Sequence, residues 1–217
     1  MELSVALKQA QSMGYAEADP TNDIEGIDVF YKTNITNMLA YNTKNDAIHK
    51  PIGITKLNTE DIKMAKANDK VIRHISLSKQ KDGEFASIIA PAFLDKGHYL
   101  ANVPDNYNAQ LIYADSFDYL GYFGQGAGQL ATAQAMLANA IDTLENRERK
   151  ICLNHEKKVN ESILKADWIV RAKKGLKADK EQSISENESY YWFEQKDATI
   201  IDTIQAFDAD AMIALWV

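Results

Sequence analysis

Residues 14–28 read GYAEADPTNDIEGID, and Lys32 follows Asp28 at a spacing of four. The segment carries five carboxylates around one Asp-Pro step. The proline disfavours helix at Asp19 and predicts a turn there, while Asp23 can cap a helix that follows. Residues four apart share a helix face, so Asp28 and Lys32 should be neighbours. The segment therefore predicts a turn, a helix start and a compact group of charges in one place.

Three interpretations of this acidic segment are open. Acidic side chains favour the N-terminal end of any helix, and an Asp–Lys pair four residues apart is most often a solvated couple. A calcium-binding EF-hand loop beginning at Asp19 would need glycine at Ile24 and glutamate at Phe30, so that interpretation fails. A substrate site is the third: two carboxylates would hold an ammonium, and a partly desolvated lysine could polarise a carbonyl or transfer a proton.

The composition limits the class of protein. With 217 residues the chain can bury a sizeable core, as one domain with an appendage or as two small domains. The formal charge of −7 argues against nucleic-acid binding, because affinity for phosphates needs clustered Lys and Arg. The single Cys152 fits a reducing compartment, no apolar run reaches the length of a membrane span, and the first residues lack signal-peptide features. We expect a cytoplasmic protein that contacts no membrane.

Apolar spacing and capping residues predict three helices in the first part of the chain. The first is expected at 4–13, with three residues facing inward: Val5, Leu7 and Ala10. The second should run from about 24 to 42, with an inward stripe of Ile24, Ile27, Tyr31, Ile35 and Leu39. Asn58 or Thr59 should cap the third helix, which ends near residue 68.

Strands are predicted at 71–79 and 84–89, joined by a hairpin turn at Asp82-Gly83, and at 107–113 and 118–123. The stretch Gly124-Gln125-Gly126-Ala127-Gly128 then leads into an Ala-rich helix at 129–144. Glycines between a strand and a helix suit a close approach of backbone to a ligand. Tight packing of the strand on the helix is the plainer explanation, and the spacing is not the G-x-G-x-x-G of a dinucleotide fold.

Histidine and cysteine give no sign of a metal site. The four histidines show no metal-ligand spacing among themselves or with Cys152: His49, His74, His98 and His155. His74 lies in the alternating strand pattern, and we expect it to be structural. The sequence therefore predicts no bound metal.

Residues 147–217 differ in character and predict a small α+β appendage. Strands are expected at 167–171, 190–193 and 211–217, and a short helix at 198–206; the Lys/Glu/Ser-rich run 173–189 is expected to be a loop. The tryptophans all fall in this part and should form its core: Trp168, Trp192 and Trp216. The fold class predicted for the whole chain is α/β (α+β-like), with a mixed sheet packed against helices and this appendage at its end.

The acidic segment and Lys32 closely resemble the signature of homoserine dehydrogenases. Three later segments agree in the same order: Gly53-Ile54-Thr55-Lys56-Leu57, His98-Tyr99-Leu100-Ala101-Asn102-Val103 and the glycine-rich stretch with Gln129-Leu130-Ala131-Thr132-Ala133. The resemblance runs from about residue 4 to 146. It implies a catalytic, substrate-binding and dimerising domain at 1–146, followed by the C-terminal appendage at 147–217. Some members of the family carry an ACT regulatory domain at this place, and a remnant of an ACT domain is one interpretation of the appendage that no motif settles.

The resemblance also implies an activity and the residues that perform it. Homoserine dehydrogenases interconvert L-homoserine and L-aspartate 4-semialdehyde with NAD(P), in the threonine and methionine branch of the aspartate pathway. Lys32 matches the catalytic lysine, Glu17 and Asp28 match the residues that hold homoserine, and Gly14 and Gly128 match positions against the nicotinamide cofactor. Members of the family form homodimers through this domain.

We expect the chain to lack the Rossmann domain that binds most of NAD(P), which a separate chain could supply. The expected partners are then the small-molecule substrate, a second copy of the chain and that Rossmann-domain chain, with no nucleic acid and no membrane. The alternative is a non-catalytic module left from a truncated enzyme, which binds an amino acid or serves only as a structural dimer. Whether a nicotinamide domain is available separates the two.

Overall fold

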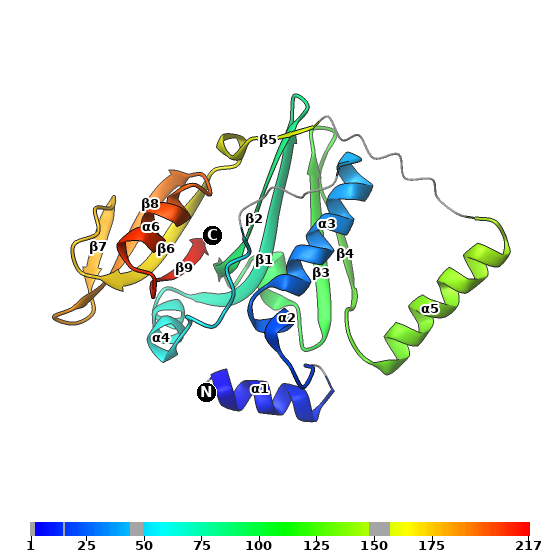
Figure 1. The fold of residues 1–217 in the computed structure, drawn as a ribbon, viewed down its shortest axis with the longest axis horizontal. Coiled ribbons are helices and arrows are strands. Elements are labelled where there is room, and N and C mark those ends of the chain that lie inside the picture. The colour runs from blue at the N-terminus through cyan, green and yellow to red at the C-terminus, as the bar shows by residue number, and fades with distance from the viewer. Residues whose placement is uncertain (1–2, 15, 44–49, 148–156) are drawn as a thin grey trace.

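The computed structural model describes residues 3–14, 16–43, 50–147 and 157–217. Its α-helices are α1 (Leu3–Ser12), α2 (Thr21–Ile24), α3 (Ile27–Tyr41), α4 (Thr59–Ala67), α5 (Gln129–Leu144) and α6 (Ile200–Phe207), with short 3-10 turns η1 (Tyr99–Asn102) and η2 (Glu161–Ile163). The strands are β1 (Lys70–Lys81), β2 (Glu84–Asp95), β3 (Tyr107–Ala114), β4 (Phe117–Gln125), β5 (Lys158–Val159), β6 (Ala166–Lys173), β7 (Lys180–Ser183), β8 (Glu188–Lys196) and β9 (Met212–Trp216). Figure 1 shows their arrangement.

One mixed sheet joins the two predicted domains. Its strand order is β1-β2-β9-β6-β8-β7, and only β2 pairs in parallel, with β9 and with the short β5. The β1–β2 hairpin turns at Asp82 and Gly83, which both have positive φ as its two-residue turn requires. β3 and β4 form a separate antiparallel pair. The predicted fold class, a mixed sheet packed against helices, is confirmed.

The core lies on both faces of the appendage strands. Alternate residues of a strand point to opposite faces, and along β6 the buried Trp168 and Val170 pack in the cluster that contains Ile201 and Ile204 of α6. Ile169 packs instead with Met64 and Ala65 of α4. α4, from the first predicted domain, therefore covers one face of the appendage sheet, and α6 covers the other.

The helix predicted from 24 to 42 is interrupted. α2 ends at Ile24, and α3 begins at Ile27 after Gly26, whose φ of 79° lies in the left-handed region. The predicted inward stripe was wrong for most of its length, because three of its members are more than half exposed: Tyr31, Ile35 and Leu39. α3 instead buries Thr33 and Asn37, and Asn37 donates a hydrogen bond to Ser87 Oγ of β2 at 3.1 Å. The apolar face of α3 is thus turned away from the sheet.

Other predictions of burial and secondary structure are confirmed in part. Val5 of α1 is exposed rather than inward, while Leu7 and Ala10 are partly buried. The run 173–189, expected to be a loop, contains β7. Trp168 is fully buried, and Trp192 and Trp216 pack against the core cluster that contains Met64 and Ala65 of α4, as predicted. β2 and β8 form where predicted but are longer than expected, at Glu84–Asp95 and Glu188–Lys196, and the short β5 was not predicted. The other helices and strands form close to their predicted positions. His49, Cys152 and His155 lie outside the described residues.

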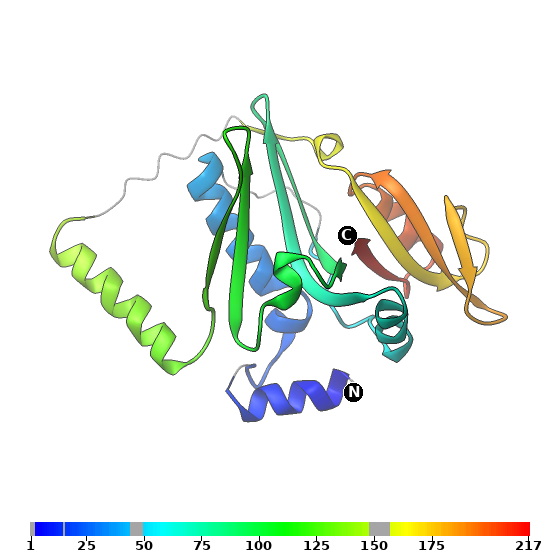
Figure 2. The same ribbon diagram turned by 180° about the vertical axis from the view of Figure 1, so that it is seen from behind.

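α5 and the β3–β4 pair contribute little to the core. α5 has no buried residue among those described, and every residue of β4 is exposed. Figures 1 and 2 show α5 standing apart from the other elements and β3–β4 lying beside α3 and β1. These elements present large apolar side chains to solvent, including Tyr119, Tyr122 and Phe123 on β4 and Leu130 and Leu144 on α5.

Candidate active site

The conformation of the acidic segment is set by local side-chain hydrogen bonds and by Gly26. Asp19 Oδ1 accepts hydrogen bonds from Thr21 N at 3.1 Å and Thr21 Oγ1 at 2.6 Å, and these contacts lower the pKa of Asp19. They close the turn predicted at Asp19-Pro20 and start α2. Gly26 then redirects the chain, so that α3 presents Asp28 in its first turn.

The segment 50–57 packs closely against this turn. Ile54 N donates a hydrogen bond to Ile24 O at 2.7 Å, and a Cβ at Gly53 would collide with the same oxygen. A Cβ at Gly26 would lie 2.6 Å from Cε1 of His74. The backbone of the acidic segment can approach the 50–57 segment this closely only because glycine occupies both positions.

His74 holds this arrangement from the sheet side. Its Nε2 lies 2.8 Å from Ile52 O, as a structural histidine would, and burial lowers its pKa more than the hydrogen bond to Ile52 O raises it. His98 caps η1, with Nδ1 accepting from Leu100 N at 3.2 Å. Within the described ranges, no three His, Cys, Asp or Glu residues are placed to hold a metal ion together.

Lys32 is held from two sides. Its Nζ lies 2.7 Å from Asp28 Oδ2, with the two side chains 49% and 45% exposed. On the other side, the side-chain amide of Asn108 in β3 lies 3.0 Å from Nζ. With its oxygen oriented toward Nζ, this amide accepts a hydrogen bond from Lys32, and its nitrogen donates to Tyr107 O at 3.2 Å. The predicted pair therefore forms, and the fold adds a third polar group from a distant part of the chain.

Asn108 also connects Lys32 to the glycine-rich stretch. A Cβ at Gly126 would collide with the Asn108 amide, so only glycine leaves room for it. Gly126 N donates to Asn106 O at 2.8 Å, and Asn106 Nδ2 donates to Ala127 O at 2.7 Å. The stretch is thus fastened to the start of β3, next to the residue that contacts Lys32.

Gly14 and Gly128 both have positive φ, 72° and 113°. Apart from the chain neighbours, no atom of the described residues lies within 4 Å of a Cβ built at Gly14, and at Gly128 the nearest is Asn106 Nδ2 at 3.6 Å. The backbone at both positions is therefore open to approach. In Figures 1 and 2 α1 forms the lower edge of the molecule, and the start of α3 and the end of β4 lie above it.

The Glu17 carboxylate does not lie with Asp28 and Lys32, although the sequence predicted that all three belong to one site. Its side chain is exposed and makes no hydrogen bond or ion pair with the described residues, while its backbone oxygen accepts from Gln11 Nε2 at 2.8 Å. The structure thus brings Asp28 and Lys32 together and leaves the Glu17 carboxylate apart. Asn108 was not predicted as a site residue, because it is 76 positions from Lys32 and only the tertiary placement of β3 beside α3 brings the two together.

Comparison with known proteins assigns the family. The family model described as homoserine dehydrogenase matches residues 1–141. The chain belongs to this family. A homoserine dehydrogenase of Neisseria gonorrhoeae is 39% identical over 137 residues, which are 63% of this chain and 32% of that protein. The chain therefore spans about a third of the length of the curated relatives it matches.

Solved homoserine dehydrogenases share the fold. The structure of the Thiobacillus denitrificans protein aligns with 100% of this chain and 59% of its own length, at a TM-score of 0.79 and 22% identity. A hyperthermophilic archaeal homoserine dehydrogenase in complex with NADPH covers 70% of this chain and 42% of its own, at a TM-score of 0.55 and 24% identity. The first likeness extends over the appendage, where the sequence resemblance is slight.

Proposed function

We propose that the chain is the substrate-binding and catalytic part of a homoserine dehydrogenase, an oxidoreductase that interconverts L-homoserine and L-aspartate 4-semialdehyde with NAD(P). Family membership supports the reaction. The observation that carries the proposal to particular residues is the contact of Lys32 with both Asp28 and Asn108, beside a glycine-rich stretch. An isolated helix pair would need neither the amide nor the glycines.

Asp28 is proposed to bind the substrate ammonium. Its Oδ2 forms the ion pair with the Lys32 ammonium at 2.7 Å, and its other carboxylate oxygen makes no hydrogen bond with the described residues, so it can accept one from a substrate ammonium. A charge-assisted hydrogen bond of this kind is about twice as strong as a neutral one. Glu17 is proposed as the second carboxylate, which would turn toward the substrate from its exposed position.

Lys32 is proposed to act on the substrate oxygen. An ammonium that donates to the carbonyl of the semialdehyde stabilises negative charge as it develops there, and the same group can pass a proton to or from the homoserine hydroxyl. Asn108 is neutral and accepts from Nζ, so it fixes the direction of Lys32 without adding a charge. An ammonium carries three N–H donors, so Lys32 can contact Asp28 and Asn108 and still donate a hydrogen bond to the substrate.

The nicotinamide group would supply or accept the hydride when bound. Gly14 and Gly128 fit its approach, since the backbone is open at both. For the pyrophosphate and adenosine, the described residues offer no strand followed by G-x-G-x-x-G and a helix. We therefore infer that most of NAD(P) is held by another domain, in the same protein or in a separate chain.

We also infer that the chain pairs with a second copy through β3 and β4. A two-stranded sheet is marginal in water without a partner surface, and one face of this pair carries the exposed Tyr113, Phe117, Tyr119 and Phe123. The apolar residues of α5 are proposed to contact the cofactor-binding domain, because the glycine-rich stretch that precedes α5 is the proposed cofactor contact.

Binding of L-homoserine to the 217-residue chain tests the assignment of the site. In an NMR titration, we expect shifts at the amides around Asp28 and Lys32, and weaker binding for Asp28→Asn, which keeps the shape and loses the charge. The matched control is Glu60→Gln, because Glu60 forms a similar ion pair with Lys63 on α4. Equal binding by Asp28→Asn and the wild-type chain would remove Asp28 from the site.

The alternative is a module that binds an amino acid or dimerises without catalysis. The exposed apolar faces of β4 and α5 are compatible with it, since structural association would also cover them. It predicts that Lys32 has no effect on any reaction when a cofactor domain is supplied.

A further inference from the structure

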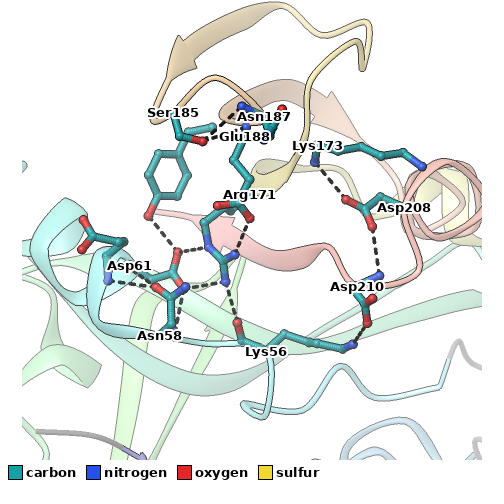
Figure 3. A network of polar contacts seen from close by, with 12 residues as sticks. Lys56, Asn58, Asp61, Arg171, Lys173, Ser185, Asn187, Glu188, Asp208 and Asp210 are labelled. Atoms are coloured by element: carbon teal, nitrogen blue, oxygen red, sulfur yellow. Dashed lines mark hydrogen bonds and ion pairs between the residues drawn. The ribbon is translucent and has the colours of Figure 1, made fainter.

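A buried polar network connects α4 to the appendage sheet (Figure 3). Arg171 of β6 donates from Nε to Asp61 Oδ1 at 3.0 Å and from Nη2 to Asp61 Oδ2 at 3.3 Å, and the side chains of Arg171 and Asp61 are 10% and 0% exposed. Tyr190 of β8 donates its hydroxyl to the same Oδ1 at 2.8 Å. Burial beside this carboxylate raises the pKa of Tyr190, so the hydroxyl keeps its proton.

Strand alternation puts Arg171 on the face that α4 covers. Its neighbours Val170 and Ala172 belong to the core cluster on the α6 side, whereas Ile169 and Tyr190 belong to the cluster with α4. The Asp61 carboxylate is held in place because its Oδ2 also accepts a hydrogen bond from Asn58 N at 2.8 Å, in the capping box that begins α4. The helix cap thus orients Asp61, and the strand places Arg171 opposite it.

Arg171 also reaches beyond α4. Its Nη2 donates to the carbonyl oxygen of Lys56 at 2.8 Å, at the end of an irregular segment that leads back to Ile52. In that segment Leu57 N donates to Ile54 O at 3.0 Å, and Ile54 N donates to Ile24 O at 2.7 Å. Ile24 is the last residue of α2 and lies two residues before Gly26, the N-cap of α3. The guanidinium thus holds one end of a segment whose other end supports the acidic turn.

We propose that Arg171 is a positioning residue for the candidate substrate site: it fixes the 52–57 segment against the turn between α2 and α3, and so links the geometry around Asp28 to the appendage. Its effect on homoserine rests on the function proposed above, whereas the positioning itself does not. Another polar contact between the 52–57 segment and the appendage is weaker. The Lys56 ammonium pairs with Asp210 at 2.6 Å, but both side chains are well exposed, and exposed pairs contribute little.

Amide hydrogen exchange on the 217-residue chain tests the positioning. Arg171→Lys keeps the charge near Asp61, but a single ammonium cannot reproduce the fork that reaches Asp61 and Lys56 O together. We expect exchange at the Ile54 amide to become about tenfold faster or more, the scale of one lost charge-assisted hydrogen bond. Amides of Val170 and Tyr191 in the sheet should change much less.

Two variants complete the test. Lys56→Ala is the matched control, because it removes the exposed pair with Asp210 and keeps the carbonyl that Arg171 contacts; Ile54 should exchange as in the wild-type chain. If Arg171→Lys does not fold, Tyr190→Phe removes one hydrogen bond from Asp61 and should give the same pattern on a smaller scale. Unchanged exchange at Ile54, or an equal rise at all amides, would overturn the positioning role.

A homoserine titration of Arg171→Lys tests the consequence for the site. We expect a lower affinity for L-homoserine than in the wild-type chain, and no change for Lys56→Ala. Unchanged affinity in Arg171→Lys, together with faster exchange at Ile54, would overturn the link to the substrate. If the wild-type chain binds no homoserine, the function proposed above fails, and hydrogen exchange still decides whether Arg171 positions the segment.

Discussion

At the scale of single residues, the difference between Lys32 and Lys63 explains why one is assigned a function. Both are exposed lysines in helical ion pairs, Lys32 with Asp28 at 2.7 Å and Lys63 with Glu60 at 2.6 Å. Such pairs contribute only about 0.3–0.5 kcal/mol to stability. Lys32 also donates to the side-chain amide oxygen of Asn108, which reaches it from β3. This extra contact constrains the lysine in a way that solubility or helix stability does not require.

The contact of Asn108 with Lys32 predicts different outcomes for two glycines. Gly126→Ala should push the Asn108 amide away from Lys32, whereas Gly124→Ala meets no atom within 4 Å and should be tolerated. Because the displaced group is a mobile side chain, we expect the free energy of unfolding to fall by less than about 1 kcal/mol in either variant. The side-chain amide resonance of Asn108 should move in Gly126→Ala alone. A similar shift in both variants would contradict the packing described here.

His74 predicts a pH dependence of stability. Burial lowers its pKa below 6.5, so the unfolded chain binds a proton in a pH range where the folded chain does not. The free energy of unfolding should therefore decrease as pH falls below about 6.5 toward the folded-state pKa, and His74 contributes no slope at pH 8, where it is neutral in both states. Chemical denaturation at several pH values should show a smaller decrease for His74→Gln. Parallel pH profiles for the two proteins would rule out His74 as the cause.

Only part of this residue-level picture could be predicted from the sequence. The capping box at Asn58 follows from local rules and was predicted as a helix start, and the spacing of Asp28 and Lys32 predicted their contact. The contacts of Asn108 with Lys32 and of Arg171 with Asp61 join residues far apart in the chain. They depend on strand register and on which face of β6 meets α4, and no local pattern encodes either.

At the scale of elements, burial was harder to predict than secondary structure. The spacing of Tyr31, Ile35 and Leu39 correctly indicates one apolar face of α3, but a pattern cannot say whether that face meets the chain's own sheet or another surface. The break between α2 and α3 was missed, because a glycine within a helical pattern does not by itself reveal the left-handed φ that Gly26 adopts. The room that its missing Cβ leaves for His74 is a tertiary contact, which the local pattern does not show either. β7 was missed because its four residues are polar and exposed.

The aromatic face of β3 and β4 predicts self-association. In sedimentation experiments at micromolar concentration, the chain should form a dimer of twice 24.3 kDa, because an exposed face of this kind marks an interaction site. Tyr119→Glu should shift the chain toward monomer by placing a charge in that face. Leu130→Glu on α5 is the control and should leave the dimer intact. A wild-type chain that sediments only as a monomer would refute this interface.

At the scale of the whole molecule, one sheet joins the substrate part to the appendage, with α4 covering part of the joint. No helix within the described ranges has the length and apolar character needed to cross a membrane. The matched family model covers residues 1–141, while the fold is shared with a solved homoserine dehydrogenase over the entire chain. The appendage shares both sheet and core with β1, β2 and α4, and Arg171 connects it to the segment that supports the turn before α3. These contacts are the physical basis of the Arg171 proposal.

The 217 residues alone should not turn over homoserine. Hydride transfer needs the nicotinamide held against the substrate carbon, and this positioning accounts for much of the lowering of the barrier. The open backbone at Gly14 and Gly128 offers contact with one end of the cofactor only. We expect no NAD(P)H production above background from the purified chain with homoserine and NAD(P). Robust production would show that these residues bind the cofactor unaided.

The kinetics of Lys32→Ala test the central claim most directly. The chain would be joined to the cofactor-binding domain of a homoserine dehydrogenase, with Lys63→Ala as the control for loss of an exposed helical ion pair. Lys32→Ala should fold normally and reduce turnover of homoserine by roughly 10²–10⁴-fold, the usual effect of losing a general acid or base, while Lys63→Ala leaves turnover unchanged. Near-wild-type turnover by Lys32→Ala would contradict the proposed role of Lys32. It would favour the alternative interpretation, in which Asp28 and Lys32 are a solvated ion pair at the start of a helix.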